Sequence, residues 1–188
     1  MNIPNALTML RIALIPVLVV VFYTEFEYHL WVAAGVFTLA AVTDWVDGYL
    51  ARRLDQTTAF GAFLDPVADK LMVATALVLM VERHDNILFT LAAAVIIGRE
   101  IVISALREWM AELGERTSVA VSYVGKVKTV FQMVAIICLL AIDPRESDGV
   151  LLAGSYVLLY TAALLTLWSM FIYLKAGWAV MRDRDNAL

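Results

Sequence analysis

Apolar residues fall into six blocks, each about long enough to cross a lipid bilayer as a helix. A membrane-spanning helix needs roughly 20 mainly apolar residues, because the hydrocarbon interior offers no partners to unpaired backbone groups. Of the 188 residues, 62% are hydrophobic, against about 45–50% in soluble domains. The pattern predicts an all-α polytopic membrane protein with six transmembrane helices. The blocks cover residues 7–24, 30–50, 63–82, 86–107, 119–142 and 150–175.

The six blocks belong to one predicted domain, which begins with a short, more polar segment. No low-complexity tract or Pro/Gly/Ser-rich linker interrupts the chain, which predicts a single membrane domain over residues 1–188. Residues Asn2 to Leu10 predict a short N-terminal interfacial helix, with Asn5 or Thr8 among its capping groups. No small-residue cleavage site follows the first block, so we interpret it as a retained span and not as a signal peptide.

Charged residues inside the blocks lie at one end of each predicted helix. Ionisable groups at membrane depth are costly and mark functional sites by default. Since successive helices run in opposite directions, these ends share one side of the membrane and can line one polar cavity. The residues are Asp44, Asp47, Asp65, Asp69, Lys70, Arg99, Glu100, Lys126 and Lys128.

The distribution of Lys and Arg predicts which side that is. The loops near residues 25–29, 82–86 and 143–149 hold only two of the 14 basic residues, Arg83 and Arg145. Because basic loops stay on the cytoplasmic side, both termini and the charged cavity are predicted to be cytoplasmic. The net charge of −4 argues against nucleic acid as a partner.

Four aspartates on two consecutive helices predict a metal site. Asp44 and Asp47 are three residues apart, and Asp65 and Asp69 four apart, so each pair shares a helix face. Helices joined by a short segment pack as antiparallel neighbours, so the four carboxylates should converge. Carboxylates left together repel one another, whereas a hard divalent cation such as Mg²⁺, Mn²⁺ or Ca²⁺ binds oxygen ligands. Four acids have room for two ions, the arrangement used in phosphoryl chemistry.

Three other interpretations remain open at this point. The acids could instead pair with Arg52, Arg53 and Lys70 to hold the helices together, although Gly48 beside Asp47 favours close approach of a ligand. A divalent-cation transporter would place its acids near the middle of the membrane with a path to both faces. A soluble prenyl-diphosphate enzyme also uses aspartate-rich helices, but its helices should have polar outer faces.

The spacing of the aspartates resembles the signature of the CDP-alcohol phosphatidyltransferase family, D-x2-D-G-x2-A-R-x8-G-x3-D-x3-D. All eight fixed positions match. The segment reads Asp44-Trp45-Val46-Asp47-Gly48-Tyr49-Leu50-Ala51-Arg52, then eight residues, Gly61, three residues, Asp65, three residues and Asp69. The resemblance implies a six-helix bacterial inner-membrane enzyme, usually a homodimer, with a cytoplasm-facing site for two Mg²⁺ or Mn²⁺ ions.

The family resemblance also implies roles for individual residues. Asp69 would both bind metal and accept the proton of the incoming hydroxyl. The implied metal ligands are Asp44, Asp47, Asp65 and Asp69. The residues implied to bind CDP-diacylglycerol are Asn5, Thr8, Asp47, Gly48, Arg52 and Thr58.

A basic cluster on the same side indicates the kind of alcohol that accepts the lipid. It is more cationic than a neutral polyol requires and suits an acceptor that carries a phosphate. Lys126 and Lys128 stand at the start of a predicted helix, where positive charge opposes the helix dipole and anion binding is favoured. The candidate phosphate-binding residues are Arg99, Arg107, Arg116, Lys126 and Lys128.

The stretch Gly98 to Glu108, followed by Ser118 to Gln132, resembles the bacterial branch of the family that uses glycerol-3-phosphate. That resemblance implies phosphatidylglycerophosphate and CMP as products and membrane lipids as surroundings. Serine, inositol phosphate and phosphatidylglycerol are the alternative acceptors within the family.

Overall fold

The computed structural model describes residues 3–54, 59–112, 123–145 and 149–185, and all regular structure in these ranges is helical. The all-α prediction is therefore confirmed. Each predicted block corresponds to one helix. The helices are α1 (Ile3–Tyr23), α2 (His29–Leu54), α3 (Ala59–His84), α4 (Ile87–Glu112), α5 (Tyr123–Ala141) and α6 (Val150–Asp185).

Four of the helices are long and apolar enough to cross a membrane. The candidate spans are Asn5–Tyr23, His29–Gly48, Ile87–Glu112 and Val150–Trp178. Helix α3 is long but polar at its beginning, where Asp65, Asp69 and Lys70 stand. In α5 the apolar part, Lys128–Ala141, is shorter. Hydrophobicity therefore defines a multi-pass membrane protein, while the polar parts of α3 and α5 coincide with the predicted cavity.

The expected short interfacial helix before the first span is not a separate element, and that prediction is wrong. Helix α1 runs without a break from Ile3 to Tyr23. Pro4 stands in its first turn, where a missing N–H costs nothing. Backbone hydrogen bonding can therefore continue from the polar start of the chain into the apolar span.

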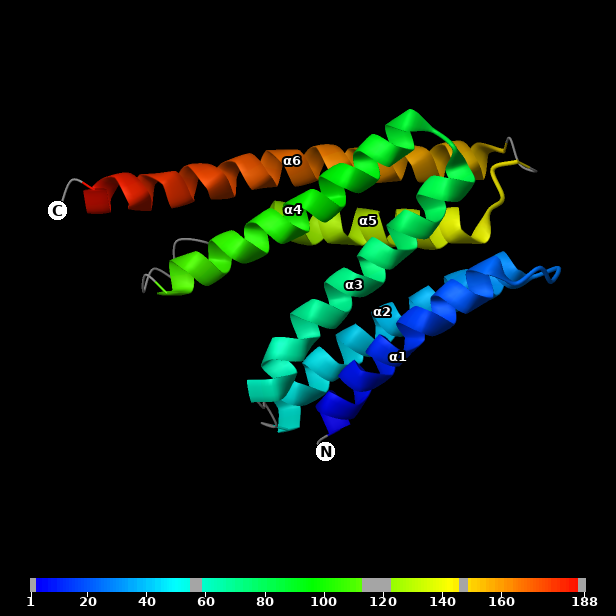
Figure 1. The fold of residues 1–188 in the computed structure, drawn as a ribbon, viewed down its shortest axis with the longest axis horizontal. Coiled ribbons are helices and arrows are strands. Elements are labelled where there is room, and N and C mark those ends of the chain that lie inside the picture. Colours follow the sequence, from blue (N-terminus) through cyan, green and yellow to red (C-terminus); the bar gives the residue numbers. More distant parts are fainter. Residues whose placement is uncertain (1–2, 55–58, 113–122, 146–148, 186–188) are drawn as a thin grey trace.

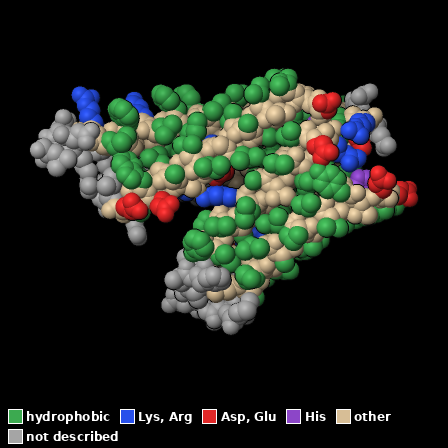
Figure 2. Space-filling view, in the orientation of Figure 1, with side chains coloured by type: hydrophobic (Ala, Val, Ile, Leu, Met, Phe, Trp, Pro, Cys, Tyr) green, Lys and Arg blue, Asp and Glu red, His purple; other side chains and the backbone are tan. Residues whose placement is uncertain are grey.

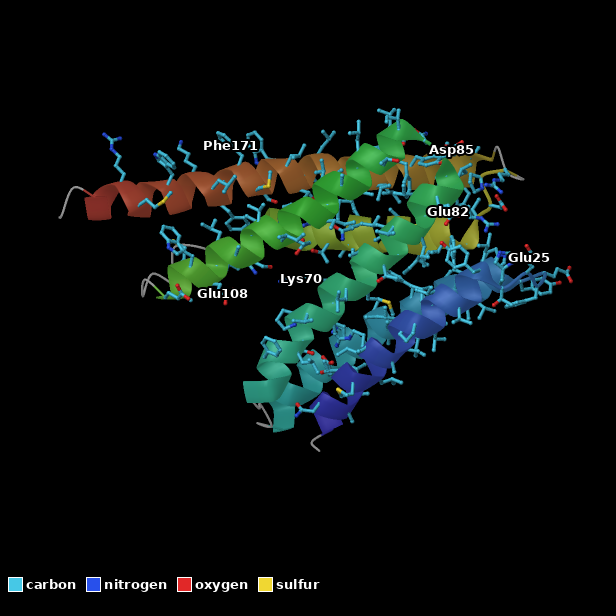
Figure 3. All side chains as sticks on the ribbon, in the orientation of Figure 1. Glu25, Lys70, Glu82, Asp85, Glu108 and Phe171 are labelled. Carbon is cyan, nitrogen blue, oxygen red and sulfur yellow. The ribbon has the colours of Figure 1, made fainter. Side chains whose placement is uncertain are left out.

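The helices enclose one main apolar core and expose apolar side chains on their outer sides. Phe37, Leu77, Phe89 and Leu139 are among its fully buried members. Hydrophobic side chains also cover much of the outer surface along the helices (Figure 2), and Phe171 of α6 is one of the exposed ones (Figure 3). Contiguous exposed apolar surface of this extent is rare in soluble monomers and fits contact with lipid.

Two groups of helices diverge toward one end of the molecule. Helices α1, α2 and the first half of α3 separate from α4, α5 and α6 toward the end that holds the N-terminus of α3 and the C-terminus of α4 (Figure 1). The space-filling view shows a notch between the groups with basic side chains at its inner end (Figure 2). Lys70 of α3 lies in this region (Figure 3) and donates a hydrogen bond to Ser104 Oγ of α4.

The opposite end is closed by polar and aromatic contacts. The Arg83 guanidinium of α3 pairs with Asp143, which follows α5. Burial raises the pKa of the Asp143 carboxyl, but the Arg145 backbone N–H and Arg83 outweigh it and hold that pKa below its ordinary value. The His84 ring stacks on Phe89 at 4.6 Å between centroids. These contacts join α3, α4 and the α5–α6 connection, so the divergence is confined to the other end.

Candidate active site

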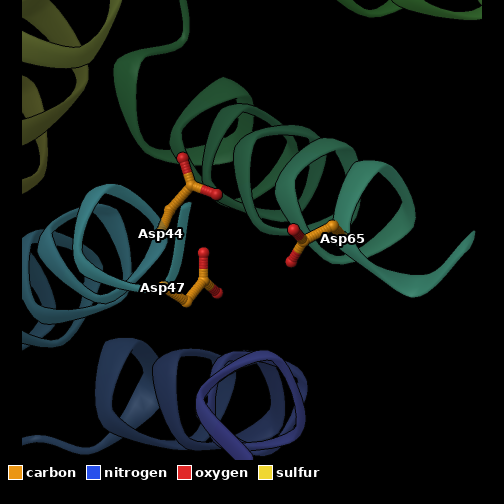
Figure 4. A group of neighbouring side chains, drawn as sticks. All are labelled: Asp44, Asp47 and Asp65. Carbon is orange, nitrogen blue, oxygen red and sulfur yellow. The ribbon is translucent and has the colours of Figure 1, made fainter. Parts of the chain in front are cut away.

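Helices α2 and α3 bring three aspartates together at the open end of the bundle. Asp44 and Asp47 lie about one turn apart on α2, and Asp65 lies on α3 (Figure 4). Each offers a carboxylate oxygen, and these oxygens all lie within 4.8 Å of one another. The three carboxylates form what we call the aspartate group.

Arg11 of α1 penetrates the aspartate group. Its side chain is 1% exposed, and its Nη1 lies 2.7 Å from Asp44 Oδ1. Its Nη2 pairs with Asp47 and lies 3.6 Å from Asp65 Oδ1. Thr8, one turn earlier on α1, donates a hydrogen bond of 2.9 Å to the same Asp65 oxygen. A third helix thus supplies positive charge to acids that would otherwise repel one another.

The aspartate group has the chemistry of a divalent-cation site. It offers only carboxylate oxygens, the ligands that Mg²⁺ and Mn²⁺ prefer. Asp47 is 2% exposed, and its buried Oδ1 has no hydrogen-bond partner among the described residues. The Arg11 guanidinium occupies the position of a cation but carries one charge against three. The residues present therefore fit a divalent metal.

Asp69 stands apart from the aspartate group. It lies one turn beyond Asp65 on α3 and lines a cavity of about 240 Å³. Its carboxylate is close enough to Asp44, Arg11 and Glu100 for their charges to act on it. The fourth aspartate therefore belongs to the lining of the cavity, one helical turn from the aspartate group.

Ionisable side chains from α3, α4 and α5 line this cavity, which we call the basic cavity. Four of them are cationic and two are anionic, so the space attracts an anion. Thr129 and Gln132 of α5 and Tyr173 of α6 add further polar groups to its lining. The ionisable residues are Asp69, Lys70, Arg99, Glu100, Arg107 and Lys128.

Glu100 and Tyr173 hold the cationic side chains in place. Glu100 Oε1 accepts a hydrogen bond of 2.6 Å from Arg99 Nη1 and one of 3.3 Å from Lys128 Nζ. The guanidinium carbons of Arg99 and Arg107 lie 5.9 and 5.8 Å from the centre of the Tyr173 ring, within range of a cation–π interaction. Glu100 bridges α4 and α5, and Tyr173 ties α6 to α4.

Several of the site residues predicted from the sequence lie at the aspartate group or the basic cavity, and others lie outside the residues that the structure describes. Arg99, Arg107 and Lys128 line the basic cavity, Thr8 contacts the aspartate group, and Gly48 follows Asp47 on α2. Asn5 lies on α1, three residues before Thr8. The backbones of Arg52 and Lys126 belong to α2 and α5, but their side chains lie outside the described part. Thr58 and Arg116 lie outside the described residues altogether.

Sequence reasoning gave no site role to Arg11, Gln132 or Tyr173, and it placed Glu100 at the cavity without assigning it a role there. Arg11 carried a signal, because it is a lone basic residue in an apolar block and intramembrane charges are functional by default. Gln132 carried a weaker signal of the same kind, as an amide four residues after Lys128 in an apolar helix. Nothing in the sequence pairs Tyr173 with arginines that are 66 or more positions away.

The chain thus combines a membrane-type helix bundle with an acidic group that could hold a metal ion and, beside it, a basic cavity. The sequence pattern of the CDP-alcohol phosphatidyltransferase family matches residues 1–179, and the chain belongs to that family. The chain is 58% identical over 179 residues to the CDP-diacylglycerol–glycerol-3-phosphate 3-phosphatidyltransferase of Yersinia pestis (strain Pestoides F), covering 95% of this chain and 96% of the relative.

Two further relatives have the same description. The protein from Pseudomonas fluorescens is 57% identical, with 95% of this chain and 91% of the relative covered. The protein from Pectobacterium atrosepticum is 58% identical, with 94% of each covered. The similarity therefore runs through the aspartate group and the basic cavity alike.

Proposed function

We propose that this enzyme transfers the phosphatidyl group of CDP-diacylglycerol to sn-glycerol-3-phosphate, giving phosphatidylglycerophosphate and CMP. The observation that carries the proposal is that Asp69 lines a cavity suited to an anion and lies one helical turn from Asp65, a member of a group of acids that could bind a metal. The activity named for relatives 57–58% identical over nearly the whole chain supports the same reaction.

The aspartate group and the start of α1 form the donor side of the site. Asp44, Asp47 and Asp65 would hold divalent cations, and Asp69, one turn beyond Asp65, is proposed as the fourth ligand. When bound, such ions stabilise charge on the diphosphate and on departing CMP. The residues proposed to bind CDP-diacylglycerol are Asn5, Thr8, Asp47, Gly48, Arg52 and Thr58.

The basic cavity forms the acceptor side. Arg99 and Lys128 are buried and already oriented by Glu100, so little side-chain freedom is lost when they bind a phosphate. Arg107 faces the same cavity, and Arg116 and Lys126 are proposed to add to it. A phosphate held there presents the hydroxyl at the other end of the acceptor to Asp69.

The reaction then needs one proton acceptor and one displacement. The primary hydroxyl oxygen of the acceptor attacks the lipid-side phosphorus, and its proton passes to the Asp69 carboxylate. The new phosphorus–oxygen bond forms as the bond to the CMP phosphate breaks, and CMP leaves with that electron pair. A carboxylate in this position needs correct placement more than unusual basicity to act.

The charged end is proposed to face the cytoplasm of a bacterium, with all six helices spanning the inner membrane. The basic loops at that end support this orientation. Exposed apolar side chains on α3 and α5, such as Val78 and Val134, support counting these two helices as spans as well, which brings the number of spans to six. One domain over residues 1–188 and a homodimer complete the proposal.

The direct test is CMP release by purified enzyme in detergent containing CDP-diacylglycerol and Mg²⁺ or Mn²⁺. Glycerol-3-phosphate, serine, inositol phosphate and phosphatidylglycerol are compared as acceptors. Release with glycerol-3-phosphate alone is expected. Release with a different acceptor would refute the acceptor assignment, and metal flux through vesicles without any CMP release would indicate a transporter.

Replacing Lys128 with alanine is expected to raise the KM for glycerol-3-phosphate about tenfold or more, with a smaller change for CDP-diacylglycerol. A charge-assisted hydrogen bond contributes roughly 1.5–3 kcal/mol, and Lys128 lines only the acceptor side. Lys126→Ala is expected to change the KM in the same direction. Lys175→Ala is the control, because Lys175 is exposed on α6. An unchanged acceptor KM in both variants would place the phosphate elsewhere.

A further inference from the structure

Two buried side chains of the basic cavity each have a polar atom without a hydrogen-bond partner among the described residues. These atoms are Nε of Arg99, a donor, and Oε1 of Gln132, an acceptor. Gln132 is 5% exposed, and both residues line the cavity. Burying such an atom without a partner is costly, and a ligand in the cavity that supplies both an acceptor and a donor would relieve that cost.

The two atoms need different partners: Arg99 Nε needs a hydrogen-bond acceptor, and Gln132 Oε1 needs a donor. A phosphate presents acceptor oxygens and satisfies Arg99 Nε, as it satisfies Lys128. A phosphate dianion has no hydrogen to give to Gln132 Oε1. An uncharged hydroxyl does, so a ligand that pairs with both atoms carries a hydroxyl that remains free while its phosphate is bound.

Gln132 is a buried polar residue on a helix whose other buried residues further along are apolar. It lies on α5 four residues after Lys128, and the buried residues further along the same helix, Ala135, Ile136 and Leu139, are apolar. An apolar side chain of similar size would remove the unpaired oxygen and pack as well. A group bound in the cavity that pairs with the amide accounts for a polar residue at this position.

We propose that Gln132 is a specificity-determining residue that accepts a hydrogen bond from the secondary hydroxyl of the acceptor. This inference rests on the proposed function. Glycerol-3-phosphate has two hydroxyls: the primary one gives its proton to Asp69, and the secondary one, on the middle carbon, takes no part in bond making. Pairing with Gln132 fixes the rotation of the glycerol chain between Asp69 and the phosphate-binding cations.

The test compares glycerol-3-phosphate with 3-hydroxypropyl phosphate, which lacks only the secondary hydroxyl. Wild-type enzyme is expected to prefer glycerol-3-phosphate in kcat/KM by about tenfold or more, because a site built to bond a hydroxyl discriminates against the analogue without it. Gln132→Met is expected to reduce kcat/KM for glycerol-3-phosphate and to leave that for 3-hydroxypropyl phosphate nearly unchanged. The preference then falls toward one.

Two variants serve as controls. Gln132→Glu keeps an acceptor oxygen at the same distance from the backbone and is expected to retain the preference, even where its charge weakens binding of both substrates. Met133→Leu changes an apolar residue of the same cavity and is expected to retain the preference as well.

Equal losses for both substrates in Gln132→Met would overturn the inference and leave the proposed function intact. A wild-type enzyme with no preference between the substrates would do the same without any variant, so the test does not depend on how well Gln132→Met folds. Absence of CMP release from wild-type enzyme with glycerol-3-phosphate would instead refute the proposed function itself.

Discussion

Asp69→Asn is expected to reduce the kcat for CMP release by roughly 10³-fold or more, while CDP-diacylglycerol still binds. The asparagine amide keeps the size of the side chain but cannot accept a proton from the attacking hydroxyl, and positioned bases contribute about 10²–10⁴-fold. The aspartate group that faces the donor, formed by Asp44, Asp47 and Asp65, is unaltered by this change. Turnover and nucleotide binding should therefore separate in this variant.

The measurement pairs single-turnover CMP release with direct binding of CDP-diacylglycerol to the same detergent-solubilised preparation. Asp85→Asn is a matched control, because Asp85 is exposed just beyond the opposite end of α3. Its φ of 39° is one that asparagine adopts readily. If Asp69→Asn lost nucleotide binding along with turnover, Asp69 would belong to the donor site and its role as base would have to be abandoned.

Arg11→Met is expected to lower the stability of the metal-free enzyme by about 3 kcal/mol, the lower end of the range for breaking a buried ion pair. Most of the penalty falls on Asp47, which is 2% exposed. Asp44 and Asp65 are each 41% exposed, so water screens their charges. Divalent cations supply the missing positive charge, so Mn²⁺ should raise the melting temperature of Arg11→Met more than that of the wild type.

The measurement is the apparent melting temperature in detergent, with EDTA and with Mn²⁺, for wild type and variant. Arg83→Met is the control: it breaks the ion pair with Asp143 at the other end of the bundle, so its loss of stability should be the same with and without metal. If Mn²⁺ stabilised Arg11→Met no more than wild type, the aspartate group would not be the metal site.

The parts of the fold that depend on local sequence could be predicted. Hydropathy locates all six helices, because the bilayer requires apolar runs of a fixed length. The helical period also places Asp44 beside Asp47, since residues three apart share a helix face. The separate interfacial helix is a wrong prediction, because α1 is one continuous helix from Ile3 to Tyr23, even with Pro16 inside it.

The parts of the site that depend on how distant helices meet could not be predicted. The convergence of Asp44, Asp47 and Asp65 follows from antiparallel packing of α2 on α3, but the offset of Asp69 toward the basic cavity depends on where α4 and α5 diverge from them. The contact of Arg11 with Asp47 spans 36 positions of sequence. No periodicity within one helix encodes such a contact.

The origin of Arg11 in the first helix has a consequence for biosynthesis. Chains are made from the N-terminus, so this arginine leaves the ribosome before Asp44, Asp47 and Asp65, its three partners in the folded bundle. The acids of the second and third helices can therefore enter the bilayer beside a counter-ion that is already in place. A positive charge beside these acids lowers the cost of placing them at membrane depth.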